Sequence, residues 1–242
     1  MKSKYYLILS CFLLVGCSSL ILNIITPNDV NNSLKVMKKG NQEVIYLPMV
    51  HVAKPEFFSQ VKKIIDSLKN NGYIVYYEGI KLDKKYYKHD LDSINKQELE
   101  ILLMKFRKMT GGFRATDLTS KNNKSLPKYY KKEKYISQSN QNLGIDSLDI
   151  HTDATLTELI NAQEKKEGKI MLSKCDFNTG FYDKYKCETV NNYYALNSYR
   201  DSIVASKVLN QNNQKSLIVF GKKHWYGIWP YFRDTGYKLV EK

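Results

Sequence analysis

Short apolar runs alternate with amphipathic segments in the first half of this chain. The run "EVIYLPMV" (43–50) is apolar and β-branched, which predicts a buried strand. The next segment, "KPEFFSQVKKIIDSLKNNG" (54–72), places apolar residues three and four apart, as an amphipathic helix does. "YIVYY" (73–77) is apolar again and predicts a second strand. A strand, a helix and a strand in this order predict two parallel strands joined by a right-handed crossover.

The same alternation returns near the C-terminus. We expect a long helix over 191–213 and a strand over 216–220. A short helix containing Pro230 (228–236) and a last strand (237–241) follow. Residues 91–109 and 154–166 are also helical in pattern, whereas 110–153 are rich in loop-forming residues. The pattern predicts an α/β fold, with a largely parallel sheet, flanking helices and a helical insertion in the middle.

The N-terminus has the features of a lipoprotein signal peptide. Lys2 and Lys4 precede an apolar run over 5–15, which is too short for the roughly 20 residues that a membrane span needs. The run ends in "LVGC", where Gly16 suits a peptidase pocket and the thiol of Cys17 is the lipidation site. The alternative is an uncleaved anchor, since "LILNII" prolongs the apolar run.

This reading divides the chain into three parts: a signal peptide (1–16), a tether from the lipidated Cys17 (17–40) and a single domain (41–242). Ser18 and Ser19 stand where an inner-membrane lipoprotein of enteric bacteria carries aspartate. We therefore expect a membrane-anchored lipoprotein of the cell envelope that faces the periplasm, with the outer membrane favoured if the cell is Gram-negative.

The charge balance changes this picture little. The chain carries 38 Lys and Arg against 24 Asp and Glu, a net charge of +14, and cleavage after residue 16 leaves +12. A basic surface fits nucleic acid or anionic membranes, and the anchor favours the membrane. The lysines are dispersed, which is typical of an ordinary solvated surface. The expected partners are the membrane, through the anchor, and a peptide or small-molecule substrate, without nucleic acid.

Export also bears on the cysteines. Cys11 lies in the signal peptide and Cys17 takes the lipid, which leaves Cys175 and Cys187. In an oxidising compartment these two cysteines either form a disulfide or remain two thiols. A disulfide closing this short loop would stabilise the fold by about 3 kcal/mol.

Three polar residues follow predicted strands directly. His51, Glu78 and His224 each lie at or just past the carboxyl end of a strand, and Gly221 lets the chain turn before His224. In open parallel sheets, ligands bind at this edge. Two imidazoles and one carboxylate form a common ligand set for a divalent metal, and they also suit acid–base catalysis. The alternative is that these are ordinary loop residues.

At these residues the chain resembles the TraB/PrgY/GumN group, which includes the TIKI metalloproteases and is related to ChaN-like lipoproteins and erythromycin esterases. The resemblance is strongest in "YRDSIVASKVLNQNNQKSLIVFGKKHWYGI" (199–228) and extends over roughly 43–241. It implies an EreA/ChaN-like fold, with His51, Glu78 and His224 as ligands of a divalent metal such as Mn, Co or Zn. It also implies catalytic roles for Glu78 and Arg200.

The first motif departs from the group. It reads "PMVH", so Pro48 stands where the group has glycine. Proline fixes φ and removes a backbone N–H donor. The direction of the His51 side chain can therefore differ from that in the group.

Arg200 has two candidate roles beside such a cluster. Its guanidinium either holds Glu78 ionised through a bidentate pair or stabilises an oxyanion during hydrolysis. The alternative is a surface arginine that pairs with Asp201 or with solvent.

A second polar cluster is "DIHTD", with Asp149, His151 and Asp153. In an extended segment these three side chains lie on one side and would extend the site or bind a cation. Asp153 also resembles the N-cap of the following helix, which is the role we expect for it. His89 is expected at the surface.

Two classes of function follow. The first is a metal-dependent, peptidase-like hydrolase with a His/Glu/His site. The second is a non-catalytic lipoprotein similar to ChaN that binds haem or another ligand through an axial His or Tyr. A scaffold that keeps the motif for packing is a third alternative.

Overall fold

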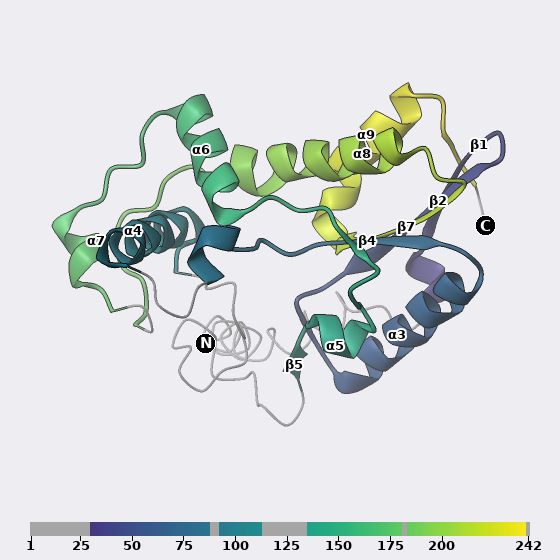
Figure 1. Cartoon of the computed structure of the whole chain (residues 1–242), viewed down its shortest axis with the longest axis horizontal. Helices are drawn as coiled ribbons and strands as arrows, with labels where there is room; N and C mark the ends of the chain where they lie inside the picture. The colour runs from purple at the N-terminus through teal and green to yellow at the C-terminus, as the bar shows by residue number, and fades with distance from the viewer. Residues whose placement is uncertain (1–29, 88–91, 113–134, 181–182, 241–242) are drawn as a thin grey trace, which may run out of the picture.

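A six-stranded mixed sheet forms the centre of the structure, which is a computed structural model describing residues 30–87, 92–112, 135–180 and 183–240 (Figure 1). Across the sheet the strands are β6 (Ile150–His151), β4 (Ile74–Tyr77), β7 (Lys215–Gly221), β2 (Gln42–Met49), β1 (Lys35–Lys39) and β8 (Lys238–Leu239). The first four are mutually parallel, whereas β1 is antiparallel to both β2 and β8. The predicted α/β fold with a largely parallel sheet is confirmed at this level.

The strand order contains one feature that the sequence pattern does not reveal. β2, the helix α3 (Pro55–Asn70) and β4 form the expected unit, and the two strands are parallel. They are not neighbours, however, because the C-terminal strand β7 lies between them and pairs with both. This insertion brings the carboxyl ends of β2, β7 and β4 side by side.

Helices cover both faces of the sheet. The helices α3 and α5 (Asn140–Leu143) lie on one face, and α8 (Arg200–Gln211) and α9 (Trp225–Asp234) lie on the other (Figure 1). Alternate side chains of β7 enter the two cores: Leu217 and Val219 pack on the α3 side, Ile218 and Phe220 on the α8 side. A strand buried on both faces is apolar throughout, which explains the continuous apolar runs in the sequence.

Three further helices form a separate group beside the sheet. They are α4 (Ser93–Thr110), α6 (Leu156–Glu167) and α7 (Lys174–Asn178), on the left of Figure 1. This group has its own core, which includes Phe106, Met109 and Leu159. It corresponds to the helical insertion that the sequence predicts.

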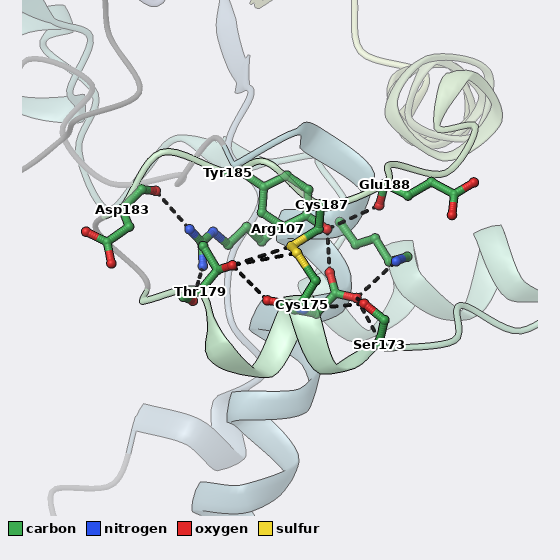
Figure 2. Close-up of a disulfide and its surroundings, with 10 residues drawn as sticks. Arg107, Ser173, Cys175, Thr179, Asp183, Tyr185, Cys187 and Glu188 are labelled. Carbon is green, nitrogen blue, oxygen red and sulfur yellow. Dashed lines mark hydrogen bonds and ion pairs between the residues drawn. A yellow bond between two sulfur atoms is a disulfide. The ribbon is translucent and has the colours of Figure 1, made fainter.

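A disulfide joins Cys175 to Cys187 in this helical group, with their Cα atoms 5.8 Å apart (Figure 2). The loop that it closes supplies the carbonyl oxygens of Thr179 and Asp183, which accept hydrogen bonds from the buried guanidinium of Arg107. The pairing expected from the export signal is therefore present, and it lies where the loop contacts α4.

The N-terminal boundary of the fold lies before residue 41. β1 pairs with β2 over its whole length and Val30 is buried in the core on the α3 side, so part of the expected tether belongs to the domain. The remaining elements are short: η1 (Asn31–Ser33), η2 (Lys84–Tyr87), η4 (Lys222–His224), and the paired strands β3 (Val52–Ala53) and β5 (Ile136–Ser137).

Cys17 and His89 lie outside the described residues. Among the helices that the structure describes, none combines the length and apolarity required to cross a membrane.

Candidate functional site

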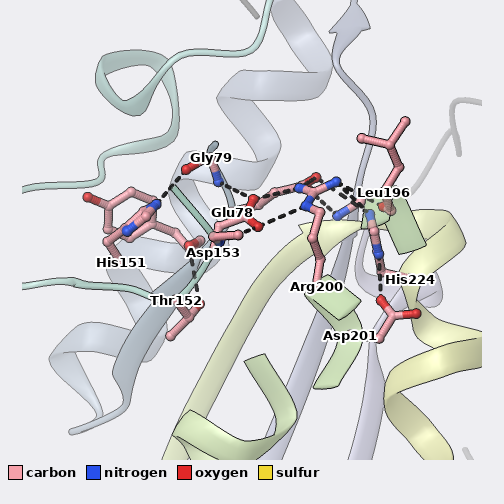
Figure 3. A network of polar contacts seen from close by, with 12 residues as sticks. Glu78, Gly79, His151, Thr152, Asp153, Leu196, Arg200, Asp201 and His224 are labelled. Carbon is pink, nitrogen blue, oxygen red and sulfur yellow. Dashed lines mark hydrogen bonds and ion pairs between the residues drawn. The ribbon is translucent and has the colours of Figure 1, made fainter. Parts of the chain in front are cut away.

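Three of the predicted site residues come together at the carboxyl edge of the sheet (Figure 3). Glu78 directly follows β4, His224 follows β7, and Arg200 is the first residue of α8. All three side chains are buried. The convergence expected from the strand ends is confirmed for these residues, and the insertion of β7 beside β4 produces it.

Arg200 is the centre of the cluster. Its Nε and Nη2 bond the two oxygens of Asp153 at 2.8 and 2.5 Å, and Nη2 also bonds Glu78 at 2.6 Å. Its Nη1 faces the carbonyl of Leu196 at 3.3 Å and Nε2 of His224 at 3.2 Å. A guanidinium has five N–H donors, and these contacts use all five. In this arrangement no donor of Arg200 remains for an oxyanion, so Arg200 positions the other side chains.

The bidentate partner of Arg200 is Asp153, not Glu78. Asp153 also accepts hydrogen bonds from the backbone N–H groups of Gly79 and Ala154. The expected N-cap role of Asp153 is wrong, because Thr155 caps α6 in a capping box with Glu158. Burial raises the pKa of Asp153, but its bonds to Arg200 and the two amides outweigh burial and lower it.

Glu78 is held from two sides. Its Oε2 accepts a hydrogen bond from the backbone N–H of Gly221, and its Oε1 accepts one from Arg200. A Cβ at position 221 would lie 3.1 Å from Oε2, so the glycine allows this close approach. Burial raises the pKa of Glu78, but the positive charge of Arg200, with a smaller contribution from His51, outweighs burial and lowers this pKa. Glu78 is therefore ionised and is a poor proton acceptor.

His224 is oriented by Asp201, for which the sequence indicates only a surface position as a partner of Arg200. Nδ1 of His224 donates to Asp201 Oδ1 at 2.5 Å, which leaves Nε2 to accept from Arg200. Because a guanidinium only donates, this arrangement assigns His224 as a neutral imidazole. A Cβ at Gly227 would collide with the Asp201 carboxylate, so the glycine after the histidine motif makes room for this pair.

The buried cluster carries excess negative charge. Glu78, Asp153 and Asp201 contribute three carboxylates, against the single guanidinium of Arg200 and a neutral imidazole at His224. Buried charges are costly unless they are paired, and apolar replacements of such clusters are often equally stable. A cluster of this kind at the carboxyl edge of a parallel sheet is therefore a functional-site candidate.

His51 lies at the rim of this cluster. Its side chain is exposed at the end of β2, and it is close enough to Glu78 for their charges to interact. Pro48, the departure in the first motif, pairs with Phe220 of β7 and lies past the residues of β2 that pair with β1. The missing N–H of the proline is tolerated there because only one side of β2 is paired.

The predicted metal set does not form in this arrangement. Within the described residues, no three His, Cys, Asp or Glu side chains are placed to hold one ion. Arg200 bonds both Glu78 and Nε2 of His224, where a shared cation would bind, and His51 lies apart at the rim. The cluster as folded does not fit an ion held by His51, Glu78 and His224.

The segment around His151 does not act as one cluster. Asp149 pairs with Lys69 of α3 at 2.6 Å, whereas Asp153 bonds Arg200. His151 lies between them, half-buried, and its Nε2 bonds the carbonyl oxygen of Gly79 at 2.5 Å. The expectation that all three share one side is therefore wrong, because the short strand β6 ends at His151 and the chain turns toward α6.

Asp153 and Asp201 belong to the site, although the sequence indicated a helix cap for Asp153 and a surface position for Asp201. The available signal was an acidic residue two positions past a strand-end histidine for Asp153, and one directly after Arg200 for Asp201. A second feature without a clear sequence signal is the π-helical turn η3 (Tyr194–Tyr199), which precedes Arg200 and supplies the carbonyl of Leu196. Such turns often occur at functional sites.

Comparisons with family models, with characterised proteins and with solved structures found no match for this chain. The resemblance to the TraB/PrgY/GumN group, its EreA/ChaN-like fold and its metal chemistry therefore stay predictions from the sequence.

Proposed function

We propose that the protein is a lipid-anchored hydrolase of the cell envelope that acts on a peptide or small-molecule substrate by acid–base catalysis. The observation that carries this proposal is the buried, negatively charged cluster at the carboxyl edge, with an exposed imidazole at its rim. His51 is the group that meets the substrate and transfers a proton. The carboxylate of Glu78 supplies negative charge beside His51.

The other members of the cluster hold Glu78 in place. Arg200 keeps Glu78 ionised, and Asp153 fixes the orientation of the guanidinium. Asp201 orients His224, which in turn contacts Arg200. Removal of the Glu78 charge should therefore affect the reaction without removing a group that touches the substrate.

The first test is hydrolysis by the full mature chain in detergent, with quenched-fluorescence peptides and p-nitrophenyl esters as substrates. We expect His51→Ala and Glu78→Gln each to lower kcat/KM on the peptide substrates by about 100-fold, the lower range for lost acid–base catalysis. Glu98→Gln is the matched control, because Glu98 is an exposed residue paired with Lys85, and this variant should retain wild-type activity.

Two additional readings of this experiment separate the alternatives. Loss of activity on treatment with a chelator would indicate that the predicted ligands His51, Glu78 and His224 hold a metal in the working enzyme. A Soret band in the absorbance spectrum would support the haem-binding alternative. Absence of hydrolysis by the wild type on every substrate would contradict the proposed activity.

The anchor is tested separately. Cells grown with radiolabelled palmitate should label the wild-type protein, and Cys17→Ala should abolish the label because the thiol of Cys17 carries the lipid. Cys11→Ala is the control, since Cys11 lies within the signal peptide, and it should label normally. Label that persists in Cys17→Ala would place the lipid elsewhere.

A further inference from the structure

We infer that His151 is a second proton-transfer residue of this site and acts as the general base. This inference rests on the proposed function, in which His51 is the other proton-transfer group. His151 is the last residue of β6, which pairs with β4, so it lies at the same edge of the sheet as Glu78 and His224 (Figure 3).

The hydrogen bond of His151 fixes which ring nitrogen carries the proton. The partner of Nε2 is the carbonyl oxygen of Gly79, which only accepts, so Nε2 must donate. In the neutral ring, Nδ1 then carries the lone pair. No described residue bonds Nδ1, and the side chain is half-buried rather than enclosed. This imidazole therefore presents a free acceptor at the edge of the sheet.

The surroundings of His151 favour the neutral form. The phenol ring of Tyr77 packs edge-on against the imidazole, and the ammonium group of Lys81 bonds the hydroxyl of Tyr77 at 2.9 Å. Burial lowers the pKa of His151, and the positive charges of Lys81 and Lys207 lower it further. The bond to Gly79 and the charge of Asp153 act in the opposite direction but are outweighed. A neutral imidazole at neutral pH is ready to accept a proton.

A single peptide group connects His151 to the buried cluster. The carbonyl of Gly79 accepts from His151, and the N–H of Gly79 donates to Asp153 Oδ2 at 3.0 Å. When Nδ1 gains a proton, the Nε2–H donor becomes charged and its bond to the carbonyl strengthens. The hydrogen bond from Gly79 to Asp153 then strengthens as well, because linked hydrogen bonds polarise one another. The Arg200–Asp153 pair thus supports the protonated state of His151.

The two histidines divide the proton transfers of hydrolysis. His151 Nδ1 takes one proton from the attacking water, whose oxygen forms a bond to the acyl carbon. The bond between that carbon and the leaving group breaks, and the leaving group takes its proton from protonated His51. Burial and the charge of Lys81 disfavour the protonated form of His151, which returns the proton readily, as a base that turns over must.

The test uses p-nitrophenyl acetate, because p-nitrophenolate leaves without a proton and the assay therefore reports the base alone. His151→Gln retains an N–H donor for Gly79 but has no basic nitrogen. We expect kcat to fall about 100-fold with little change in KM, and the acidic limb of the pH–rate profile to disappear. His51→Ala should impair this ester less than it impairs a peptide substrate.

Lys81→Gln provides a charge control. This variant removes one of the charges that lower the pKa of His151, so the acidic limb of the profile should move to higher pH. A merely structural role of His151 predicts no such movement. Nitrogen-15 NMR of the wild-type histidine rings provides a readout without substrate. We expect the neutral form with the proton on Nε2 and a pKa below the ordinary 6.5.

The outcomes are distinct. If the wild type is active and His151→Gln keeps both its rate and its acidic limb, His151 is not the base and the proposed hydrolase stands. If His151→Gln does not fold, the NMR titration decides, and a proton on Nδ1 or a pKa above 6.5 overturns the assignment. A wild type without any esterase or peptidase activity overturns both proposals.

Discussion

Arg200→Met should lower the free energy of unfolding by about 4 kcal/mol, the middle of the range for breaking a buried ion pair. The substitution leaves Glu78 and Asp153 buried without their cation. Both carboxylates are almost fully inaccessible in the fold, so water cannot replace the guanidinium. Urea unfolding at pH 7 measures the loss, and Arg233→Met is the matched control. Arg233 pairs with Asp234 at the exposed surface, and its loss should cost about 0.5 kcal/mol.

The loss of unfolding free energy in Arg200→Met should depend on pH. In the wild type, Glu78 and Asp153 have lowered pKa values, so their contribution to stability is full above their unfolded pKa values and is lost as pH falls through the folded ones. In the variant the guanidinium is absent, so burial raises the pKa of both carboxyl groups. Their protonation in mild acid then stabilises the folded protein. The difference between the two proteins should therefore be largest near neutral pH and should narrow below about pH 4.

A triple variant tests whether the unpaired charges cause the loss of stability. Arg200→Met combined with Glu78→Gln and Asp153→Asn removes the uncompensated charges and should recover part of the lost stability. A loss of less than 1 kcal/mol in the single variant, equal at pH 4 and pH 7, would show that solvent reaches the cluster and that the buried network is not formed.

Reduction of the Cys175–Cys187 bond should lower the free energy of unfolding by about 3 kcal/mol, the chain-entropy value for a loop of this length. The loop also holds Arg107 through two carbonyl groups, and Tyr185 packs against the same guanidinium. A released loop should therefore loosen the contact with α4 and become accessible to proteases. Urea unfolding and limited proteolysis measure the two effects.

The double variant Cys175→Ser/Cys187→Ser serves as the reference for this experiment. It should match the reduced wild type in stability and should not respond to dithiothreitol. Equal stability of the oxidised and reduced wild type would contradict the expected contribution of the bond. Neither substitution alters the residues of the nearby buried pair Lys108 and Asp176.

Much of the local structure was determined by the sequence itself. The apolar run of β2 and the three-and-four spacing of α3 specify these elements because each must bury one surface, and the observed bounds agree closely with the pattern. The strand-end positions of Glu78 and His224 were also visible, since a parallel sheet collects the residues that follow its strands at one edge. The sequence likewise predicted the pairing of Cys175 with Cys187.

Only the tertiary structure decided how the cluster is connected. Arg200 contacts Asp153, which is 47 positions away, because β7 inserts beside β4 and α8 packs across that face. Asp201 turned out to be the partner of His224 rather than a surface residue, since α8 and α9 pack together and Gly227 leaves room for the carboxylate. The periodicity of apolar residues indicates which side of a helix or strand is buried. It does not indicate which charged residue, distant in the sequence, a given side chain contacts. Charge partners depend on strand order and helix packing, and these are set by the whole chain.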